Sequence, residues 1–223
     1  MDRLSEAGYA ALVAGGEAVK HMREGVKVWQ LADGRIVKLF RPRGRFSRSR
    51  LRPSNRRFAS NAERLRRLGF VSVDVLQLFM LETNGCFGVV YEGVQGRTLE
   101  SLFRDETSDE RLDVLARLLA GLHRAGVLFR SLHLGNLIEM DLGELALIDV
   151  EEVKFRSRPL SVGARVQNFQ HLLRRPIDRQ LIDAAAFTVL VECYLQHCEL
   201  SGSVQTRLRT RLMDLRADIR DDS

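Results

Sequence analysis

Three polar residues stand beside short apolar runs of the sequence: Lys38, Asn136 and Asp149. A lysine ammonium can hold an anion as a point charge, and amide and carboxylate oxygens suit a hard cation such as Mg²⁺. Asp149 follows the apolar run 145–148, where an acid at the end of a buried strand is more often functional than decorative. The alternatives are that Lys38 is a surface lysine on an exposed strand and that Asn136 is a turn residue after Gly135.

The segment that contains Asn136 has a recognisable pattern. Residues 122–138 read LHRAGVLFRSLHLGNLI and resemble the catalytic loop of protein-kinase-like phosphotransferases, in which an Asn follows the catalytic Asp after five residues. Here Ser131 precedes Asn136 by the same five positions. Residues 147–150 (LIDV) resemble the metal-binding segment of these enzymes, and residues 37–40 (VKLF) resemble their third-strand lysine. The three segments follow one another in the expected order.

The resemblance extends over residues 26–174 and is greatest to the bacterial lipopolysaccharide-core sugar kinases and the related "toluene tolerance" kinase-like proteins. The run 129–136, followed by residues 148–150 and the stretch 155–160, is similar to the second group in particular. This resemblance implies an α+β, two-lobed protein-kinase-like fold, with a small antiparallel β N-lobe that carries one helix and a mainly helical C-lobe. It also implies ATP and Mg²⁺ as cofactors, a cytoplasmic location, and a lipopolysaccharide-core sugar as acceptor.

The resemblance assigns a role to each polar residue of these segments. Lys38 would hold the α- and β-phosphates of ATP, while Asp149 and Asn136 would bind the Mg²⁺ that bridges the phosphates. The backbone of Glu92 and Val94, in the segment that joins the lobes, would contact the adenine edge. A plain strand exit at a glycine is the alternative interpretation of that segment.

The helix expected at 54–68 should supply a partner for the lysine, which in kinases is a glutamate. Its only acid, Glu63, lies about 155° from the middle of the apolar face at 100° per residue. Asn61 lies at the edge of that face and is the better-phased candidate. A neutral amide would hold Lys38 more weakly than a carboxylate. A glycine-rich phosphate loop is also missing from the sequence.

Ser131 is the main departure from the kinase pattern, because it occupies the position of the catalytic aspartate. A serine hydroxyl is a poor base. Because phosphoryl transfer passes through a loose transition state, a reduced rate could survive with Ser131 orienting the acceptor. His133 could act as the base instead, since its intrinsic pKa is near neutral, although a structural role is the competing interpretation. Otherwise the chain is a pseudokinase that binds nucleotide without turnover.

The hydrophobic pattern predicts the elements that position these residues. We expect an N-lobe over residues 1–93 and a C-lobe over 94–223, with a ligand cleft at their junction. The expected helices span residues 4–13, 54–68, 108–126, 178–200 and 204–219. The expected strands span 26–31, 35–40, 71–81, 86–91, 137–138 and 145–148, with turns at Asp33-Gly34, 83–85 and 141–143.

The positive charge is unevenly distributed along the chain. The 223 residues carry a formal net charge of +6, yet residues 41–57 alone contain eight arginines and no acid. This arginine-rich loop is a candidate arm for an anionic glycan, for lipopolysaccharide or for peripheral contact with the inner face of the cytoplasmic membrane, or else a solvated loop. Its single aromatic residue, Phe46, disfavours nucleic acid. The sequence opens without a secretory pattern, and no run of 18 apolar residues occurs.

Two functions follow from these observations. The first is an atypical phosphotransferase that moves the γ-phosphoryl group of ATP to a lipopolysaccharide-core sugar or related envelope glycan. The second is a nucleotide-binding pseudokinase with a regulatory or scaffold role in envelope biogenesis. Ser131 favours the second, and the retained Lys38, Asn136 and Asp149 favour the first. The acceptor and the oligomeric state are left open.

Overall fold

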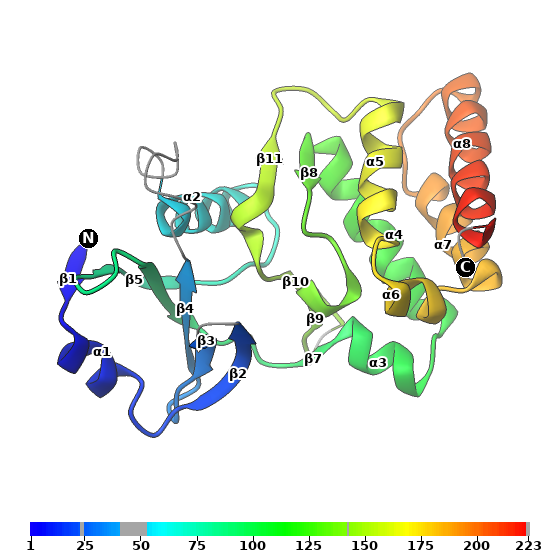
Figure 1. Ribbon diagram of the computed structural model, residues 1–223. Coiled ribbons are helices and arrows are strands. Elements are labelled where there is room, and N and C mark those ends of the chain that lie inside the picture. Colours follow the sequence, from blue (N-terminus) through cyan, green and yellow to red (C-terminus); the bar gives the residue numbers. More distant parts are fainter. Residues whose placement is uncertain (23–24, 41–52, 142, 222–223) are drawn as a thin grey trace. The chain divides into compact units, whose positions relative to one another are not determined.

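A computed structural model describes the chain except for residues 23–24, 41–52, 142 and 222–223, and it does not describe the side chains of residues 22–26 and 217–221. The chain forms two compact units, Met1–Val94 and Gln95–Ser223, which are labelled by element in Figure 1. The boundary inferred from the sequence, between residues 93 and 94, lies one residue earlier. Each unit has its own sheet and its own core.

The first unit is built on a six-stranded sheet in the order β1-β5-β6-β4-β3-β2. Only β1 and β5 pair in parallel; the other neighbours are antiparallel. The strands are β1 (Asp2–Leu4), β2 (Glu17–Met22), β3 (Gly25–Gln30), β4 (Arg35–Phe40), β5 (Val75–Leu81) and β6 (Phe87–Glu92). The sequence predicts β3 to β6 but misses β1, which is very short, and β2, whose polar residues show no apolar alternation.

Glycine turns join the central strands, as the sequence predicts. Between β3 and β4, Gly34 adopts a φ of 87°, and the Asp33 carboxylate accepts a hydrogen bond from the Arg35 amide at 3.1 Å. Between β5 and β6, Gly85 adopts a φ of 66° and the Asn84 side chain accepts from the Cys86 amide at 3.0 Å. A positive φ costs glycine little, so these turns fix the strand registers locally.

The alternation of β4 sends its side chains to two different helices. Val37 joins the cluster on which α1 (Glu6–Leu12) packs, together with Phe79. The residues on either side of Leu39 face α2 (Ser54–Arg67): the Phe40 ring lies 5.7 Å from the ring of Phe58, which is fully buried on that helix. Successive strand residues point to opposite faces, so the sheet is covered by one helix on each side.

The second unit is mainly helical (Figure 1). Its helices are α3 (Leu99–Asp105), α4 (Asp109–Arg124), α5 (Val162–Leu172), α6 (Pro176–Leu181), α7 (Ala184–Gln196) and α8 (Gly202–Asp221), with short 3₁₀ turns η2 (Leu134–Asn136) and η3 (Val150–Glu152). Its strands form a three-stranded sheet in the order β10-β9-β7 and a pair β11-β8. They are β7 (Arg97–Thr98), β8 (Val127–Phe129), β9 (Leu137–Glu139), β10 (Leu145–Leu147) and β11 (Val153–Phe155).

One predicted helix of this unit is wrong in extent. The apolar stretch 178–200 is divided into α6 and α7, because Asp183 lies between them and caps α7 by accepting a hydrogen bond from the Ala186 amide at 2.9 Å. The predicted start of α4 is confirmed: the Ser108 hydroxyl accepts from the Arg111 amide at 3.4 Å. N-cap side chains of these types satisfy amides that the helix itself leaves without partners.

A buried polar group fixes α4, α5 and α7 together. The His123 ring is fully buried. Its Nδ1 accepts a hydrogen bond from the Tyr194 hydroxyl at 2.7 Å, and its Nε2 donates to the side-chain oxygen of Asn168 at 3.1 Å. Arg165 in turn donates to the Tyr194 hydroxyl at 2.8 Å. Burial, and then the nearby positive charge of Arg165, lower the pKa of His123 to about 3. The imidazole is therefore neutral in the folded protein.

This buried histidine makes stability depend on pH. Because the folded pKa of His123 is below its unfolded value, the unfolded chain binds more protons between about pH 3 and 6.5, so unfolding becomes easier as the pH falls through that window. His123→Gln keeps a donor and an acceptor but does not titrate. From pH 6 to pH 5 we expect the unfolding free energy of wild type to fall by about 1.2 kcal/mol more than that of the variant.

Urea unfolding at pH 7, 6 and 5 measures this difference. The other titrating groups are common to both proteins and cancel in the comparison. Parallel pH profiles for the two proteins would contradict a neutral, buried His123.

Candidate functional site

The segment predicted as a catalytic loop, residues 129–136, follows β8 directly and is fixed at its start. The Asn168 side chain forms two hydrogen bonds with the backbone of Phe129: Nδ2 donates to the carbonyl at 2.8 Å, and Oδ1 accepts from the amide at 3.3 Å. β8 also pairs with β11, where Phe129 lies opposite Val153. A completely buried Asn thus holds the residue two positions before Ser131. The sequence analysis missed Asn168, a polar residue within an apolar helical pattern.

Asn136 holds the end of this loop. Its side-chain nitrogen donates to the Ser131 carbonyl at 2.8 Å, and its own carbonyl accepts from the Ile148 amide at 3.0 Å. β9 and β10 form an antiparallel hairpin in which Leu137 lies opposite Leu147. Asn136 and Asp149 therefore lie at the same end of one hairpin, Asn136 just before its first strand and Asp149 just after its second. The structure brings together these two predicted residues, which are 13 positions apart in the sequence.

Asp149 has an unusual backbone conformation. With φ 55° and ψ 45°, it is the only non-glycine residue with positive φ in the part of the chain that the structure describes. Left-handed backbone costs an L-residue roughly 1–2 kcal/mol, and Asp and Asn tolerate it better than most. Such strain concentrates at functional sites because the surroundings must impose it. Here it turns the chain directly from β10 into η3.

The chemistry of this hairpin end suits Mg²⁺. The side-chain nitrogen of Asn136 donates to the Ser131 carbonyl, so Oδ1 is the atom that this side chain can offer to a cation. The backbone of Asp149, which carries a carboxylate, lies at the same end of the hairpin. The described residues contain no group of three or more His, Cys, Asp or Glu that could hold a metal by themselves. Mg²⁺ commonly binds one or two protein carboxylates and completes its shell with phosphate oxygens and water. The donor set therefore fits a cation that arrives with a phosphate ligand.

The middle of the loop is held by α6 and α3. The Leu134 amide donates to Asp178 Oδ1 at 3.2 Å, and Asp178 Oδ2 lies 3.3 Å from Arg175 Nε, an ion pair without hydrogen-bond geometry. Arg175 Nη1 donates to His133 Nδ1 at 2.8 Å, and Arg175 Nη2 donates to Glu100. His133 and Ser131 are both half-buried. The sequence analysis missed Glu100, Arg175 and Asp178, because no local pattern signals pairs so distant in sequence.

The carboxylates of this group have opposite pKa shifts. Burial raises the pKa of Asp178 to about 6, although Arg175 and the Leu134 amide oppose the shift. Burial also raises the pKa of Glu100, but hydrogen bonds from Arg175 and Arg104 outweigh that effect and leave it below its usual value. Glu100 is therefore the firm counter-charge of Arg175 at neutral pH.

Lys38, in the first unit, is buried on the α2 side of the sheet. It is 4% exposed, and its Nζ lies 5.3 Å from the centroids of both the Phe40 and the Phe58 rings. An ammonium above aromatic faces is attracted by their quadrupoles, and the attraction grows when the cation is desolvated. The alternative that Lys38 is an exposed surface lysine is therefore wrong.

On α2, Asn61 is buried and Glu63 is exposed, as the helical spacing of the apolar residues predicts. Asn61 is 8% exposed and lies three residues after Phe58 on the covered face, whereas Glu63 is exposed and pairs with Arg67. A contact between Asn61 and Lys38 remains a prediction. α2 is held to the sheet by a buried Asn that the sequence does not single out: Asn55 Nδ2 donates to the Phe79 carbonyl of β5 at 3.1 Å and to the Gly88 carbonyl of the neighbouring β6 at 3.0 Å.

The segment predicted to contact adenine ends the first unit. Glu92 is the exposed last residue of β6, its amide donates to the Asp74 carbonyl at 2.9 Å, and Val94 is half-buried. Between them, a Cβ atom on Gly93 would lie 2.3 Å from the Gly34 carbonyl oxygen. Close packing against the β3–β4 turn therefore requires a glycine here.

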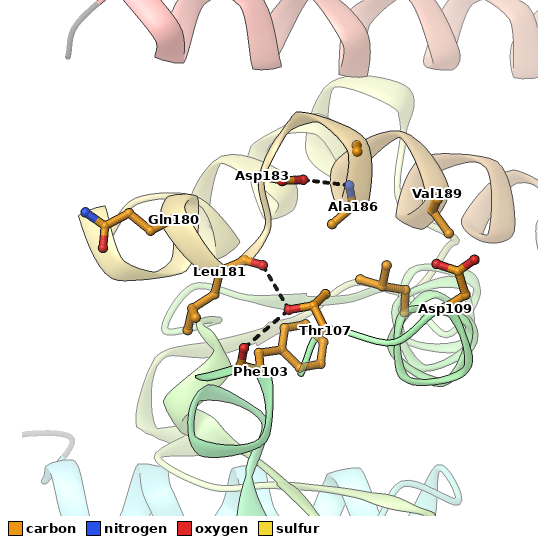
Figure 2. Close-up of a pocket in the computed structure, with 10 residues that line it drawn as sticks. Phe103, Thr107, Asp109, Gln180, Leu181, Asp183, Ala186 and Val189 are labelled. Atoms are coloured by element: carbon orange, nitrogen blue, oxygen red, sulfur yellow. Dashed lines mark hydrogen bonds between the residues drawn. The ribbon is translucent and has the colours of Figure 1, made fainter. Parts of the chain in front are cut away.

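A groove of about 420 Å³ lies elsewhere in the second unit, where the segment after α3 meets α6 and the starts of α4 and α7. Figure 2 shows the Thr107 hydroxyl between two backbone carbonyls; the distances are 3.4 Å to Phe103 and 3.2 Å to Leu181. The hydroxyl ties the segment after α3 to α6, and the groove contains none of the residues predicted from the sequence.

The arginine-rich loop falls only in part within the residues that the structure describes. Residues 41–52 lie outside the described residues, while Arg56 and Arg57 lie exposed in the first turn of α2. Among the helices that the structure describes, none combines the length and apolar content that crossing a bilayer requires.

Comparison with known proteins adds to this geometry. No family model matches the chain, and a search of curated proteins finds no similar sequence. Among solved structures, an aminoglycoside-3'-phosphotransferase of type VIII matches with a TM-score of 0.66 and 16% identity, over 94% of this chain and 97% of that one. WbdD matches with a TM-score of only 0.47 and 15% identity, over 85% of this chain and 48% of WbdD, so no argument rests on it. The chain has a protein-kinase-like fold, as its sequence predicts.

The backbone of Asp149 gives a test that needs no ligand. We expect Asp149→Gly to be more stable than Asp149→Ala by about 1 kcal/mol, because glycine adopts the left-handed conformation without steric cost whereas alanine does not. Both variants remove the carboxylate equally. Denaturant unfolding of the pair measures the difference, and an alanine variant as stable as the glycine variant would contradict the left-handed assignment.

Proposed function

We propose that this protein binds ATP with Mg²⁺ and acts as an atypical phosphotransferase. The observation that carries the proposal is the hairpin end at which Asn136 and the strained Asp149 lie together, in a chain with a protein-kinase-like fold. Phosphoryl transfer depends mainly on positioning and on neutralising phosphate charge. Two residues with hard oxygen donors, whose backbones meet at one end of a hairpin behind a loop fixed at three points, fit that requirement.

ATP contacts are also proposed for residues of the first unit. The buried ammonium of Lys38 would contact the α- and β-phosphates, and Asn61 would support it from α2. The backbone of Glu92 and Val94 would contact the adenine edge. The aromatic surroundings of Lys38 favour this role, because a desolvated point charge interacts more strongly with a phosphate than a hydrated one does.

For the acceptor, we propose a hydroxyl group of a lipopolysaccharide-core sugar or a related anionic envelope glycan. This finer statement rests on the sequence resemblance of residues 26–174 and on the eight arginines of residues 41–57. Such a density of positive charge would attract a phosphorylated glycan or an anionic membrane surface. Action at the inner face of the cytoplasmic membrane fits both features.

A pseudokinase that binds nucleotide without transfer is the second candidate. The observation in its favour is that Ser131 replaces the expected catalytic aspartate, and that its carbonyl rather than its hydroxyl is used to hold Asn136. General-base catalysis contributes typically 10²–10⁴-fold. Loss of the base would reduce transfer by that order without affecting nucleotide binding.

Nucleotide binding can be tested by thermal unfolding with and without ATP and Mg²⁺. At ATP concentrations of 100 times Kd we expect stabilisation by about 2.7 kcal/mol. Asp149→Gly should abolish the Mg²⁺-dependent part of this stabilisation. The matched control is Asp141→Gly, at the exposed turn of the same hairpin, which should respond like wild type. Equal stabilisation of the Asp149 and Asp141 variants would exclude Asp149 as a metal ligand.

Single-turnover transfer from [γ-³²P]ATP to de-O-acylated lipopolysaccharide core separates enzyme from pseudokinase. We expect slow transfer by wild type and a rate increase of about 100-fold in Ser131→Asp, the lower end of the range that a positioned base supplies. Transfer by Ser131→Asp alone would identify the wild type as a pseudokinase. Transfer by neither protein, despite ATP binding, would exclude this class of acceptor.

A further inference from the structure

The two consecutive arginines that follow α5 each contact one histidine ring, and in both cases the contacted atom is Nδ1. Arg174 Nη2 lies 2.7 Å from His171 Nδ1, and Arg175 Nη1 lies 2.8 Å from His133 Nδ1. A guanidinium can only donate hydrogen bonds and stays protonated in proteins. Each contacted Nδ1 must therefore be the unprotonated, accepting nitrogen of its ring.

From this contact we propose that Arg175 is a positioning residue that fixes His133 as the neutral tautomer with its proton on Nε2. In this tautomer His133 acts as a hydrogen-bond donor through Nε2, and its basic nitrogen is occupied by Arg175. His133 is then not the base that replaces the missing aspartate. The proposal deepens the proposed function and rests on it only for its catalytic consequence.

The contact between Arg175 and His133 belongs to a larger group of polar contacts around the same guanidinium. Arg175 also donates to Glu100 on α3, and its Nε lies 3.3 Å from Asp178 Oδ2. Three groups from three segments thus fix one guanidinium. The backbone leaves little space beneath them, because a Cβ atom on Gly135 would lie 3.0 Å from Glu100 Oε2 and 3.2 Å from both Arg175 Nη1 and His133 Cε1.

The consequence for catalysis concerns how the acceptor loses its proton. Neither Ser131 nor His133 would take that proton before transfer. The acceptor hydroxyl would lose it late, to the transferred phosphoryl group or to water, as the loose transition state permits. No covalent intermediate on the protein is required. In this tautomer, the ring nitrogen that His133 could present to the reacting groups is a donor rather than an acceptor.

Long-range ¹H–¹⁵N spectra distinguish protonated from unprotonated ring nitrogens and test the tautomer without nucleotide. At pH 7 we expect His133 to show an unprotonated Nδ1 and a protonated Nε2, with its signals identified among the five histidines by their loss in His133→Gln. Arg175→Met should convert His133 to a mixture of tautomers, whereas Arg175→Lys should retain the wild-type pattern. Arg174→Met is the matched control, which should change His171 and leave His133 as it is.

The proposal is overturned if wild-type His133 carries its proton on Nδ1, or if Arg175→Met leaves the tautomer unchanged while circular dichroism shows a folded protein. Should Arg175→Met fail to fold, Glu100→Gln, which loosens the guanidinium, gives the same test through a smaller shift toward the mixture. Since the spectra need neither ATP nor an acceptor, failure of phosphoryl transfer would leave this result intact.

For the catalytic consequence, His133→Gln, which keeps a donor, should retain transfer within about 3-fold, whereas His133→Ala should lower kcat by 10-fold or more with KM for ATP unchanged. Equal losses in the two variants would contradict the donor role.

Discussion

The side chain and backbone of Asn136 form the connection on which the candidate site depends. The Asn136 side chain donates to the Ser131 carbonyl at 2.8 Å, and its backbone carbonyl accepts from the Ile148 amide at 3.0 Å. Asn136 therefore connects the loop to the segment between β10 and Asp149. The bond from the amide nitrogen also settles which way the carboxamide faces. Were this anchor lost, the two oxygen donors would move independently, and a cation that needs near-ideal geometry would lose its site.

The strained backbone of Asp149 is tolerated because the segments around it are held firmly. β11 pairs with β8 after the turn, and Asn168 holds Phe129 at the end of β8 through two hydrogen bonds. The Asn168 side-chain oxygen in turn accepts a hydrogen bond from Nε2 of the neutral His123. Because each buried donor here has an acceptor, the polar groups specify one arrangement of α4, α5 and the loop. The core and the site are therefore held by the same side chains.

The sequence predicts what local chemistry determines. Asp33-Gly34 and the Ser108 cap act within a few residues, and both were predicted correctly. The spacing from Ser131 to Asn136 located the loop because that motif is local as well. The break between α6 and α7 was missed, since Asp183 was counted within an apolar run and not weighed as a cap.

Contacts between distant segments were beyond local patterns. Arg175 and His133 are 42 residues apart, and Asn55 reaches carbonyls 24 and 33 residues away. Nothing in the neighbourhood of these residues distinguishes them from ordinary polar positions. The role of His133 shows this most clearly. The sequence alone allows it to be a base, whereas the contact of Arg175 with its Nδ1 supports the proposal that it is a hydrogen-bond donor.

The central proposal is that a metal–nucleotide complex binds at the end of the hairpin where Asn136 and Asp149 lie. Oxidative cleavage with Fe²⁺ in place of Mg²⁺ measures this directly, because radicals formed at the bound metal cut the nearest backbone. With ATP, Fe²⁺ and ascorbate, the account predicts cuts close to residues 136 and 149 that depend on ATP and are suppressed by excess Mg²⁺. Cuts that ignore ATP, or that spare residues 136 and 149, would contradict it.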